Sequence, residues 1–257
     1  MHTTAKQGVQ MNAPSETVQP REYKYYVMIS SFLVSMMLLS NLISSAKFIS
    51  LSIVPGFGWV SLSGSAVVYP FVFIGGDILT EIYGYARTRR VIWTGLLVFI
   101  VSTILIWLVG VWPAASFWTD QESYDRIFGR VPRILLGSYV AYVVGEFVNS
   151  FVLAKIKVYA YRSFANKNSF WSMAKRFIVS TFAGQFFDSV VFFPIALYGT
   201  IGDLELVKLV LCSWLFKTAW EALFVVFTVP LVRWLKRIEH EDYLDESTDF
   251  VPWSLGK

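Results

Sequence analysis

Six long apolar segments recur along the chain and limit what it can fold into. Each is apolar on all sides, whereas a helix of a soluble protein is apolar along one stripe. About twenty such residues, rising 1.5 Å each, cross the ~30 Å hydrocarbon core of a bilayer. The sequence therefore predicts an all-α polytopic membrane protein with six transmembrane helices. The expected helices run over Tyr25–Ala46, Gly64–Tyr85, Val91–Trp112, Arg133–Ala154, Ala174–Leu197 and Leu206–Val232.

Lysine and arginine are distributed unequally between the flanks of these segments. Fourteen lie on one side: Arg21, Lys24, Arg87, Arg89, Arg90, Lys155, Lys157, Arg162, Lys167, Lys175, Arg176, Arg233, Lys236 and Arg237. Five lie on the other: Lys47, Arg126, Arg130, Arg133 and Lys208. Because cytoplasmic flanks carry the excess of positive charge, both termini are predicted to be cytoplasmic. An even number of spans agrees with this, and the chain is expected in the cell (inner) membrane.

Composition divides the chain into three parts and argues against several classes of protein. We expect a polar N-terminal extension over 1–24, a transmembrane domain over 25–236 and an acidic C-terminal tail over 237–257, with both ends solvated and partly disordered. The net charge of +4 sits in short loops, so no direct nucleic-acid binding is expected. Cys212 is the single cysteine, so the sequence predicts neither an intrachain disulfide nor a metal cluster, and it indicates no cofactor.

Ionisable and amide side chains inside the apolar segments carry the functional information. A charge at the bilayer centre costs at least about 2.5–3.5 kcal/mol, so each needs a partner or a water-filled cavity. Pairs of these residues are three or four apart and so share one side of a helix. These pairs are Asp77 with Glu81, Glu146 with Asn149, Gln185 with Asp188, and Lys217 with Glu221. Glu81 is expected nearer the cytoplasmic rim, and four helices are predicted to share a polar cavity because five of these residues are expected in the middle third of their spans: Asp77, Glu146, Gln185, Asp188 and Lys217.

Structural explanations compete with binding for some of these residues. Lys217 and Glu221 could neutralise each other on one helix, and Glu81 could pair with one of the arginines at 87, 89 and 90 to fasten the cytoplasmic end. Asn41 could act only as an interhelical hydrogen-bonding group. For Asp77, Glu146 and Asp188 such an explanation is weaker, since three carboxyl groups face the one ammonium of Lys217. Either protonation or hydrogen bonds from a donor-rich ligand are needed to offset the free-energy cost of burying these carboxyl groups.

The residue types near this cavity favour a polar organic solute. Phenylalanines that include Phe73 and Phe192 flank the carboxylates and amides. A carboxylate can accept two hydrogen bonds from an amidine-like edge, and aromatic faces can stack on a ring. A guanine-type heterocycle has both features and is one candidate.

Three motifs carry a resemblance to a known family. The runs are GDILTEIYGYARTRR (Gly76–Arg90), GEFVNSFVLAKIK (Gly145–Lys157) and RFIVSTFAGQFFDSVVFFPIA (Arg176–Ala196). In this order they resemble the queuosine precursor transporter family, formerly grouped as vitamin uptake transporters, and the likeness extends from about Tyr25 to Lys236. The resemblance implies import of 7-cyano- or 7-aminomethyl-7-deazaguanine, precursors of the tRNA nucleoside queuosine, and no enzymatic activity.

The resemblance also implies roles for individual residues. Asp77 and Glu81 match the acidic second-span motif, Glu146 and Asn149 the fourth-span motif, and Ser180, Thr181, Gly184, Gln185 and Asp188 the fifth-span motif. Glu146 or Asp188 would accept from the guanine-like edge, and Asn149 and Gln185 would donate to the ring carbonyl. Asp77 would face the aminomethyl ammonium or carry a coupling proton, and Lys217 would balance charge. Asn41, Phe73 and Phe192 complete the expected substrate-binding set.

Two other readings remain beside a stand-alone transporter. The family also resembles the substrate-binding membrane subunits of energy-coupling-factor importers, which need a separate ATPase; no GxxxxGK[ST] motif occurs in this chain. An intramembrane acid hydrolase with Asp77 and Asp188 as a dyad is disfavoured, because no enzyme motif surrounds either residue. Small six-helix transporters often pair, so a homodimer is one expectation, and the sequence leaves the oligomeric state open.

Overall fold

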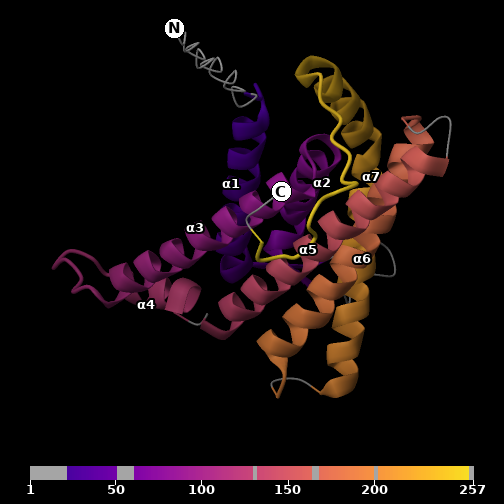
Figure 1. Cartoon of the computed structure of the whole chain (residues 1–257). Coiled ribbons are helices and arrows are strands. Elements are labelled where there is room, and N and C mark those ends of the chain that lie inside the picture. The colour runs from indigo at the N-terminus through magenta and orange to yellow at the C-terminus, as the bar shows by residue number, and fades with distance from the viewer. Residues whose placement is uncertain (1–21, 51–60, 130–131, 164–167, 200–201, 255–257) are drawn as a thin grey trace, which may run out of the picture.

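The protein is a bundle of long helices (Figure 1), and its described residues include one short antiparallel pair of strands. The computed structural model describes residues 22–50, 61–129, 132–163, 168–199 and 202–254. The helices are α1 (Tyr26–Ala46), α2 (Tyr69–Tyr83), α3 (Tyr85–Val111), α4 (Gln121–Tyr124), α5 (Pro132–Ser163), α6 (Phe170–Leu197) and α7 (Asp203–Glu239). Strands β1 (Phe48–Ser50) and β2 (Ser61–Ser63) pair with Ile49 opposite Leu62. A 3₁₀ turn (Gly64–Val67) precedes α2, and a π turn (Asp125–Gly129) follows α4.

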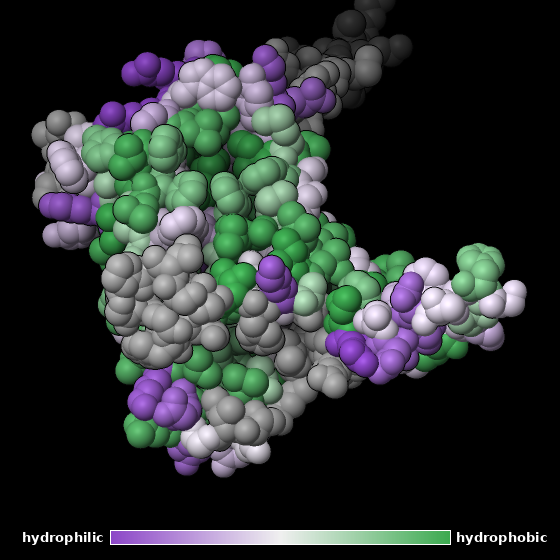
Figure 2. Space-filling model, turned by 180° about the vertical axis from the view of Figure 1, so that it is seen from behind, coloured by the Kyte–Doolittle hydropathy of each residue, from purple (hydrophilic) through white to green (hydrophobic). Residues whose placement is uncertain are grey.

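Five helices of the described chain are long and apolar enough to cross a membrane: α1, α3, α5, α6 and α7. The outward side of α3 is apolar, since Leu97, Leu105 and Trp107 are each more than half exposed. Such a surface is suited to lipid rather than to water. In Figure 2, hydrophobic residues cover the middle of the face in view and hydrophilic ones gather at its upper end. This pattern fits a multi-pass membrane protein.

The prediction of one continuous second span over Gly64–Tyr85 is wrong. The 15-residue helix α2 covers only about 22 Å at 1.5 Å per residue. Pro70 lies in its first turn, where a missing N–H is tolerated, and Gly84 ends it with a φ of 87°, a conformation suited to glycine. Helix α2 contacts α1, α3, α5 and α7, and nearly all of its side chains are buried. It is a central helix surrounded by the others.

Helices α5 and α6 approach closely at two glycines. A Cβ atom added to Gly184 would lie 2.7 Å from the Asn149 Cβ and 2.9 Å from the Gly145 carbonyl oxygen. A Cβ added to Gly145 would lie 2.9 Å from the Asp188 Cβ. Small residues allow helix backbones in membranes to approach in this way. The contact therefore places the polar residues of α5 beside those of α6.

A side chain at Gly184 should separate these helices. Because one of the crowded atoms belongs to the backbone, Gly184→Ala is expected to lower the free energy of unfolding by about 1–3 kcal/mol. Denaturant titration in mixed micelles measures the change. Gly202→Ala is the matched control, since nothing lies within 4 Å of a Cβ added there. Equal stability of Gly184→Ala and wild type would contradict the close contact.

The beginning of α1 and the end of α7 lie together. The backbone N–H of Lys24 donates to Glu239 Oε2 at 3.1 Å, and the Tyr23 hydroxyl donates to Glu241 Oε2 at 2.9 Å. We call this end of the bundle the terminal end. The chain thus enters the bundle at α1 and leaves it at α7 from the same end.

Residues 241–254 form a strap across the terminal end, so the expectation of a solvated tail is wrong for them. The Tyr243 N–H donates to the Ile82 carbonyl at 3.0 Å. Both carboxylate oxygens of Asp245 accept from the Tyr85 N–H at 3.1 Å, and Asp245 is buried. Arg89 donates to the carbonyls of Asp249 and Val251 at 2.6 and 2.7 Å. The break at Gly84 exposes the first N–H groups of α3, and the strap supplies their acceptor.

Asp245 should therefore act as an N-terminal cap of α3. Asp245→Ala is expected to lower the free energy of unfolding by about 0.5–2 kcal/mol, the usual effect of removing a cap. Glu246→Ala, at a neighbouring exposed carboxylate that pairs with Arg162, is the control and should change little. Thermal unfolding in detergent compares the two variants, and an equal effect of both would argue against the cap.

Candidate binding site

Four buried carboxyl groups from four helices gather in the interior of the bundle. They belong to Asp77 on α2, Glu146 on α5, Asp188 on α6 and Glu221 on α7, each no more than 4% exposed. Glu146 lies within electrostatic reach of the other three. The structure thus brings together residues that lie up to 144 positions apart, as Asp77 and Glu221 do. We call these side chains and their partners the acidic chamber.

Asp188 is the best satisfied of the four. Its Oδ1 accepts from the Tyr69 hydroxyl at 2.6 Å, and its Oδ2 accepts from Lys217 Nζ at 2.6 Å. The Lys217 ammonium also lies 4.3 Å from the centroid of the Tyr69 ring, a cation–π contact. Lys217 therefore pairs across helices with Asp188, and the expected pair between Lys217 and Glu221 is not what forms. Tyr69 was not singled out from the sequence, because a tyrosine among apolar residues gives no distinctive signal.

The two amides of the chamber donate to carboxylates. Asn149 Nδ2 donates to Asp77 Oδ1 at 2.8 Å, and Gln185 Nε2 donates to Glu221 Oε1 through a short hydrogen bond. Their N–H groups are therefore engaged within the protein, although the sequence assigned them to a ligand carbonyl. The amide oxygens of both residues are buried without a hydrogen-bond partner among the described residues. The chamber consequently offers acceptors more than donors.

Glu146 is fully buried, and neither of its carboxylate oxygens has a hydrogen-bond partner in the described chain. Its carboxyl group lies against the backbone of α2 at Gly76. A Cβ atom added to Gly76 would come within 1.7 Å of Glu146 Oε1. Because glycine has no side chain, position 76 leaves room for this carboxyl group.

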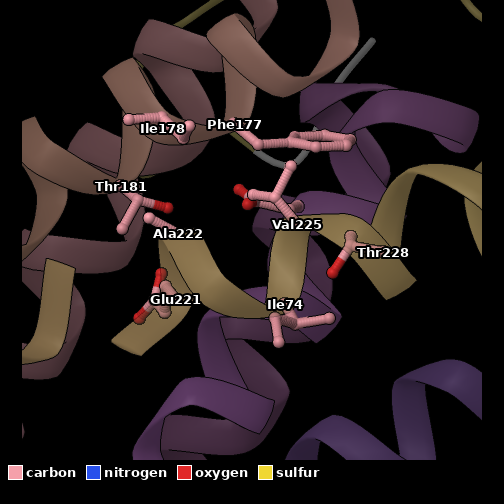
Figure 3. A pocket seen from close by; sticks show the side chains of 9 residues that line it. Ile74, Phe177, Ile178, Thr181, Glu221, Ala222, Val225 and Thr228 are labelled. Atoms are coloured by element: carbon pink, nitrogen blue, oxygen red, sulfur yellow. The ribbon is translucent and has the colours of Figure 1, made fainter. Parts of the chain in front are cut away.

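The space inside the chamber is small. A cavity of about 10 Å³, room for one water molecule, is lined by Asp77, Thr181 and Glu221 together with apolar residues of α2, α6 and α7. Figure 3 shows Thr181, from α6, and Glu221, from α7, on the same side of this pocket. This cavity is too small for a ring, so a ring-sized ligand bound here requires the helices around it to move apart.

The remaining expected substrate-binding residues lie in different places. Phe73 is buried beside the chamber, with its ring 5.4 Å from that of Tyr69. Phe192 lies one turn beyond Asp188 on α6 and packs against Phe193 at 5.1 Å. Asn41 donates to the Met37 carbonyl of its own helix at 2.9 Å. That bond agrees with neither the interhelical role nor the ligand contact expected for Asn41.

Glu81 belongs to a separate cluster of charges at the terminal end. Its Oε1 accepts from Arg176 at 2.6 Å and from Lys236 at 2.7 Å, and the carboxyl group is fully buried. Lys157 donates to the Glu81 carbonyl and pairs with Asp242 at 2.7 Å. These partners are not the expected arginines: Arg87 donates to the Tyr83 carbonyl, and Arg89 donates to the strap. The cluster ties α2 to α5, α6 and α7.

Asp242 joins the strap to this cluster. Its Oδ1 lies 2.7 Å from Lys157 Nζ and 2.8 Å from Lys236 Nζ. Burial opposes its ionisation, yet the two ammonium groups hold the pKa of the Asp242 carboxyl below its usual range. With a depressed folded-state pKa, the stability that this carboxylate contributes is present above the unfolded-state value and is lost as the pH falls through the folded-state one. The cluster should therefore remain intact at neutral pH.

The acidic chamber bears no sign of a metal centre. Within the ranges that the structure describes, no three histidine, cysteine, aspartate or glutamate side chains are grouped to hold an ion. What the arrangement can do is accept several hydrogen bonds from a buried donor.

Sequence comparisons relate the chain to known transporters. The model of a family described as "Putative vitamin uptake transporter" matches residues 63–231, which include the residues of all four chamber carboxyl groups. A "Probable queuosine precursor transporter" of Bacillus subtilis is 30% identical over 143 residues, 56% of this chain and 59% of the relative. A protein of the same description in Haemophilus influenzae is 27% identical over 132 residues, 51% of this chain and 50% of the relative.

The matched stretches span little more than half the length of these curated relatives. No solved structure matches the chain. The family model covers well over half of the chain, and five helices of membrane-spanning length fit a transporter. The chain therefore belongs to the vitamin uptake transporter family, as its sequence motifs indicated.

Proposed function

We propose that this protein imports queuosine precursors, 7-cyano- or 7-aminomethyl-7-deazaguanine, across the cell membrane. In this proposal the short helix α2 is a sixth crossing inside the bundle, and both termini are cytoplasmic. The names of the two relatives support the substrate class. The observation that carries the proposal is the set of unpaired acceptors on Glu146, Asn149 and Gln185.

The guanine-like edge of these molecules suits such a set of acceptors. It presents the ring N1–H and an exocyclic amine side by side, and one carboxylate can accept from both. Glu146 is the free acceptor for this edge, because Asp188 already binds Tyr69 and Lys217. The hydroxyls of Tyr142 and Ser189, buried without partners among the described residues, are available to donate to the ring carbonyl.

The remaining chamber residues have supporting roles in this proposal. Asp77 faces the aminomethyl ammonium when that form binds, and Phe73 offers an aromatic face to the ring. The Lys217 ammonium neutralises Asp188, so the empty chamber carries less negative charge. Asn149 and Gln185 hold Asp77 and Glu221 in place while their own oxygens accept from the ligand.

Uptake by proteoliposomes tests this proposal. Purified protein should accumulate labelled 7-cyano-7-deazaguanine inside vesicles, whereas vesicles without protein should not. Binding without accumulation would favour a recognition subunit that needs a separate ATPase. Neither binding nor accumulation of either deazaguanine would contradict the proposed substrate class.

Recognition of the exocyclic amine gives a further test. An analogue of 7-cyano-7-deazaguanine without this amine leaves one carboxylate oxygen of Glu146 unpaired in the complex. Its affinity should be roughly five- to a hundredfold weaker, since an unmet buried acceptor costs about 1–3 kcal/mol. Equilibrium competition against the labelled ligand measures the difference. Equal affinities would contradict the proposal that Glu146 accepts hydrogen bonds from this edge.

A further inference from the structure

The acidic chamber holds more carboxyl groups than its cation can neutralise. The chamber contains four carboxyl groups and one ammonium, that of Lys217, which is engaged with Asp188. Asp77 and Glu221 each accept from one amide. Glu146 alone of the four has no donor at either oxygen among the described residues. An ionised carboxylate without a donor in a low-dielectric interior is very costly, so the neutral acid is the form that fits.

We propose that Glu146 carries a proton in the closed, empty site and releases it when the substrate binds. This inference rests on the proposed function for the identity of the ligand. A protonated carboxyl group presents one O–H donor, which opposes the paired donors of a guanine-like edge. The ionised group presents two acceptors, which match them. On binding, the O–H bond of Glu146 breaks, its proton leaves to solvent, and two N–H···O hydrogen bonds form.

The groups around Glu146 explain why its charge depends on the ligand. Those within electrostatic reach of it are Tyr69 and Asp77 from α2, Tyr142 from α5, Asp188 from α6 and Glu221 from α7, and the Lys217 ammonium lies against the Tyr69 ring. All of these are carboxyl or phenol groups except Lys217, and the positive charge of Lys217 is paired with Asp188. None of the described neighbours therefore supplies a free positive charge to hold Glu146 ionised in the empty site. A bound donor-rich ring would supply the missing hydrogen bonds.

The pH dependence of ligand affinity tests the inference. The probe is labelled 7-cyano-7-deazaguanine, which has no ammonium group that could titrate. Release of about one proton per ligand predicts an affinity that rises up to about tenfold per pH unit between about pH 6 and about pH 8. In Glu146→Gln, which cannot ionise, the affinity should be weaker and should not change with pH. Glu205→Gln, which removes an exposed carboxylate at the start of α7, should keep the wild-type slope.

Infrared difference spectroscopy follows the same proton directly, at ligand concentrations that saturate both wild type and Glu146→Gln. Addition of ligand to wild type should remove the carbonyl band of a protonated carboxyl group, and Glu146→Gln should lack that change. A pH-independent affinity in wild type would overturn the proton release alone. A slope or band that persists in Glu146→Gln would move the proton to another carboxyl group and overturn the assignment. Absence of binding by wild type at every pH would instead overturn the proposed function.

Discussion

Lys217→Met is expected to lower the free energy of unfolding by about 3–5 kcal/mol at neutral pH, the usual effect of breaking a buried ion pair. Lys217 provides the cationic partner of Asp188, and both lie inside the bundle with their charged atoms 2.6 Å apart. Methionine keeps much of the side-chain volume, so the change isolates the charge. Asp188 would keep only the Tyr69 hydroxyl as a donor. Denaturant titration in mixed micelles measures the loss.

A second substitution separates lost charge from lost packing. In Lys217→Met with Asp188→Asn, no unpaired charge remains, so we expect most of the lost stability to return. If the double variant were as unstable as Lys217→Met, packing around position 217 would be the cause. If Lys217→Met were as stable as wild type, the pairing of these residues would be refuted.

Glu81→Ala should be destabilising to a similar degree, about 3–5 kcal/mol, because Arg176 and Lys236 lose a shared buried carboxylate. The two cations would then lie near each other and near Lys157 with one fewer anion to balance them. Glu122→Ala, at an exposed pair with Arg126, is the control and should have little effect. The same denaturant titration in mixed micelles compares them.

A substitution of Glu81 also distinguishes a structural role at the terminal end from a role in ligand binding. Because its partners are at the terminal end rather than in the acidic chamber, Glu81→Gln protein that remains folded should bind 7-cyano-7-deazaguanine with nearly wild-type affinity. An affinity loss as large as that of Glu146→Gln would instead assign Glu81 to the binding site, as its sequence motif predicted.

The sequence predicted the residues of the chamber better than their partners. Spacing of three or four residues identifies the side of a helix, and distance from the span ends identifies depth. Asp77, Glu146 and Asp188 follow from these two rules. Which amine or amide approaches each carboxyl group depends on helix rotation and packing. Lys217 therefore pairs with Asp188 on α6 rather than with Glu221 on its own helix.

The break at Gly84 and the strap were harder to predict. A run that is apolar on all sides predicted one long continuous span, whereas α2 is a 15-residue helix that other helices surround. The acidic residues of the strap look like a solvated tail when they are considered alone. Asp245 is buried because the break at Gly84 leaves an N–H at Tyr85 that needs an acceptor. That requirement arises only when segments distant in the chain meet.

A crystal structure with bound 7-aminomethyl-7-deazaguanine tests the central claim most directly. If carboxyl groups from four helices form one chamber for a donor-rich guest, the ring will lie among Asp77, Glu146 and Asp188, with its amine-bearing edge on Glu146. A ring held elsewhere, such as in the pocket beside Arg233 and His240 at the terminal end, would contradict the account.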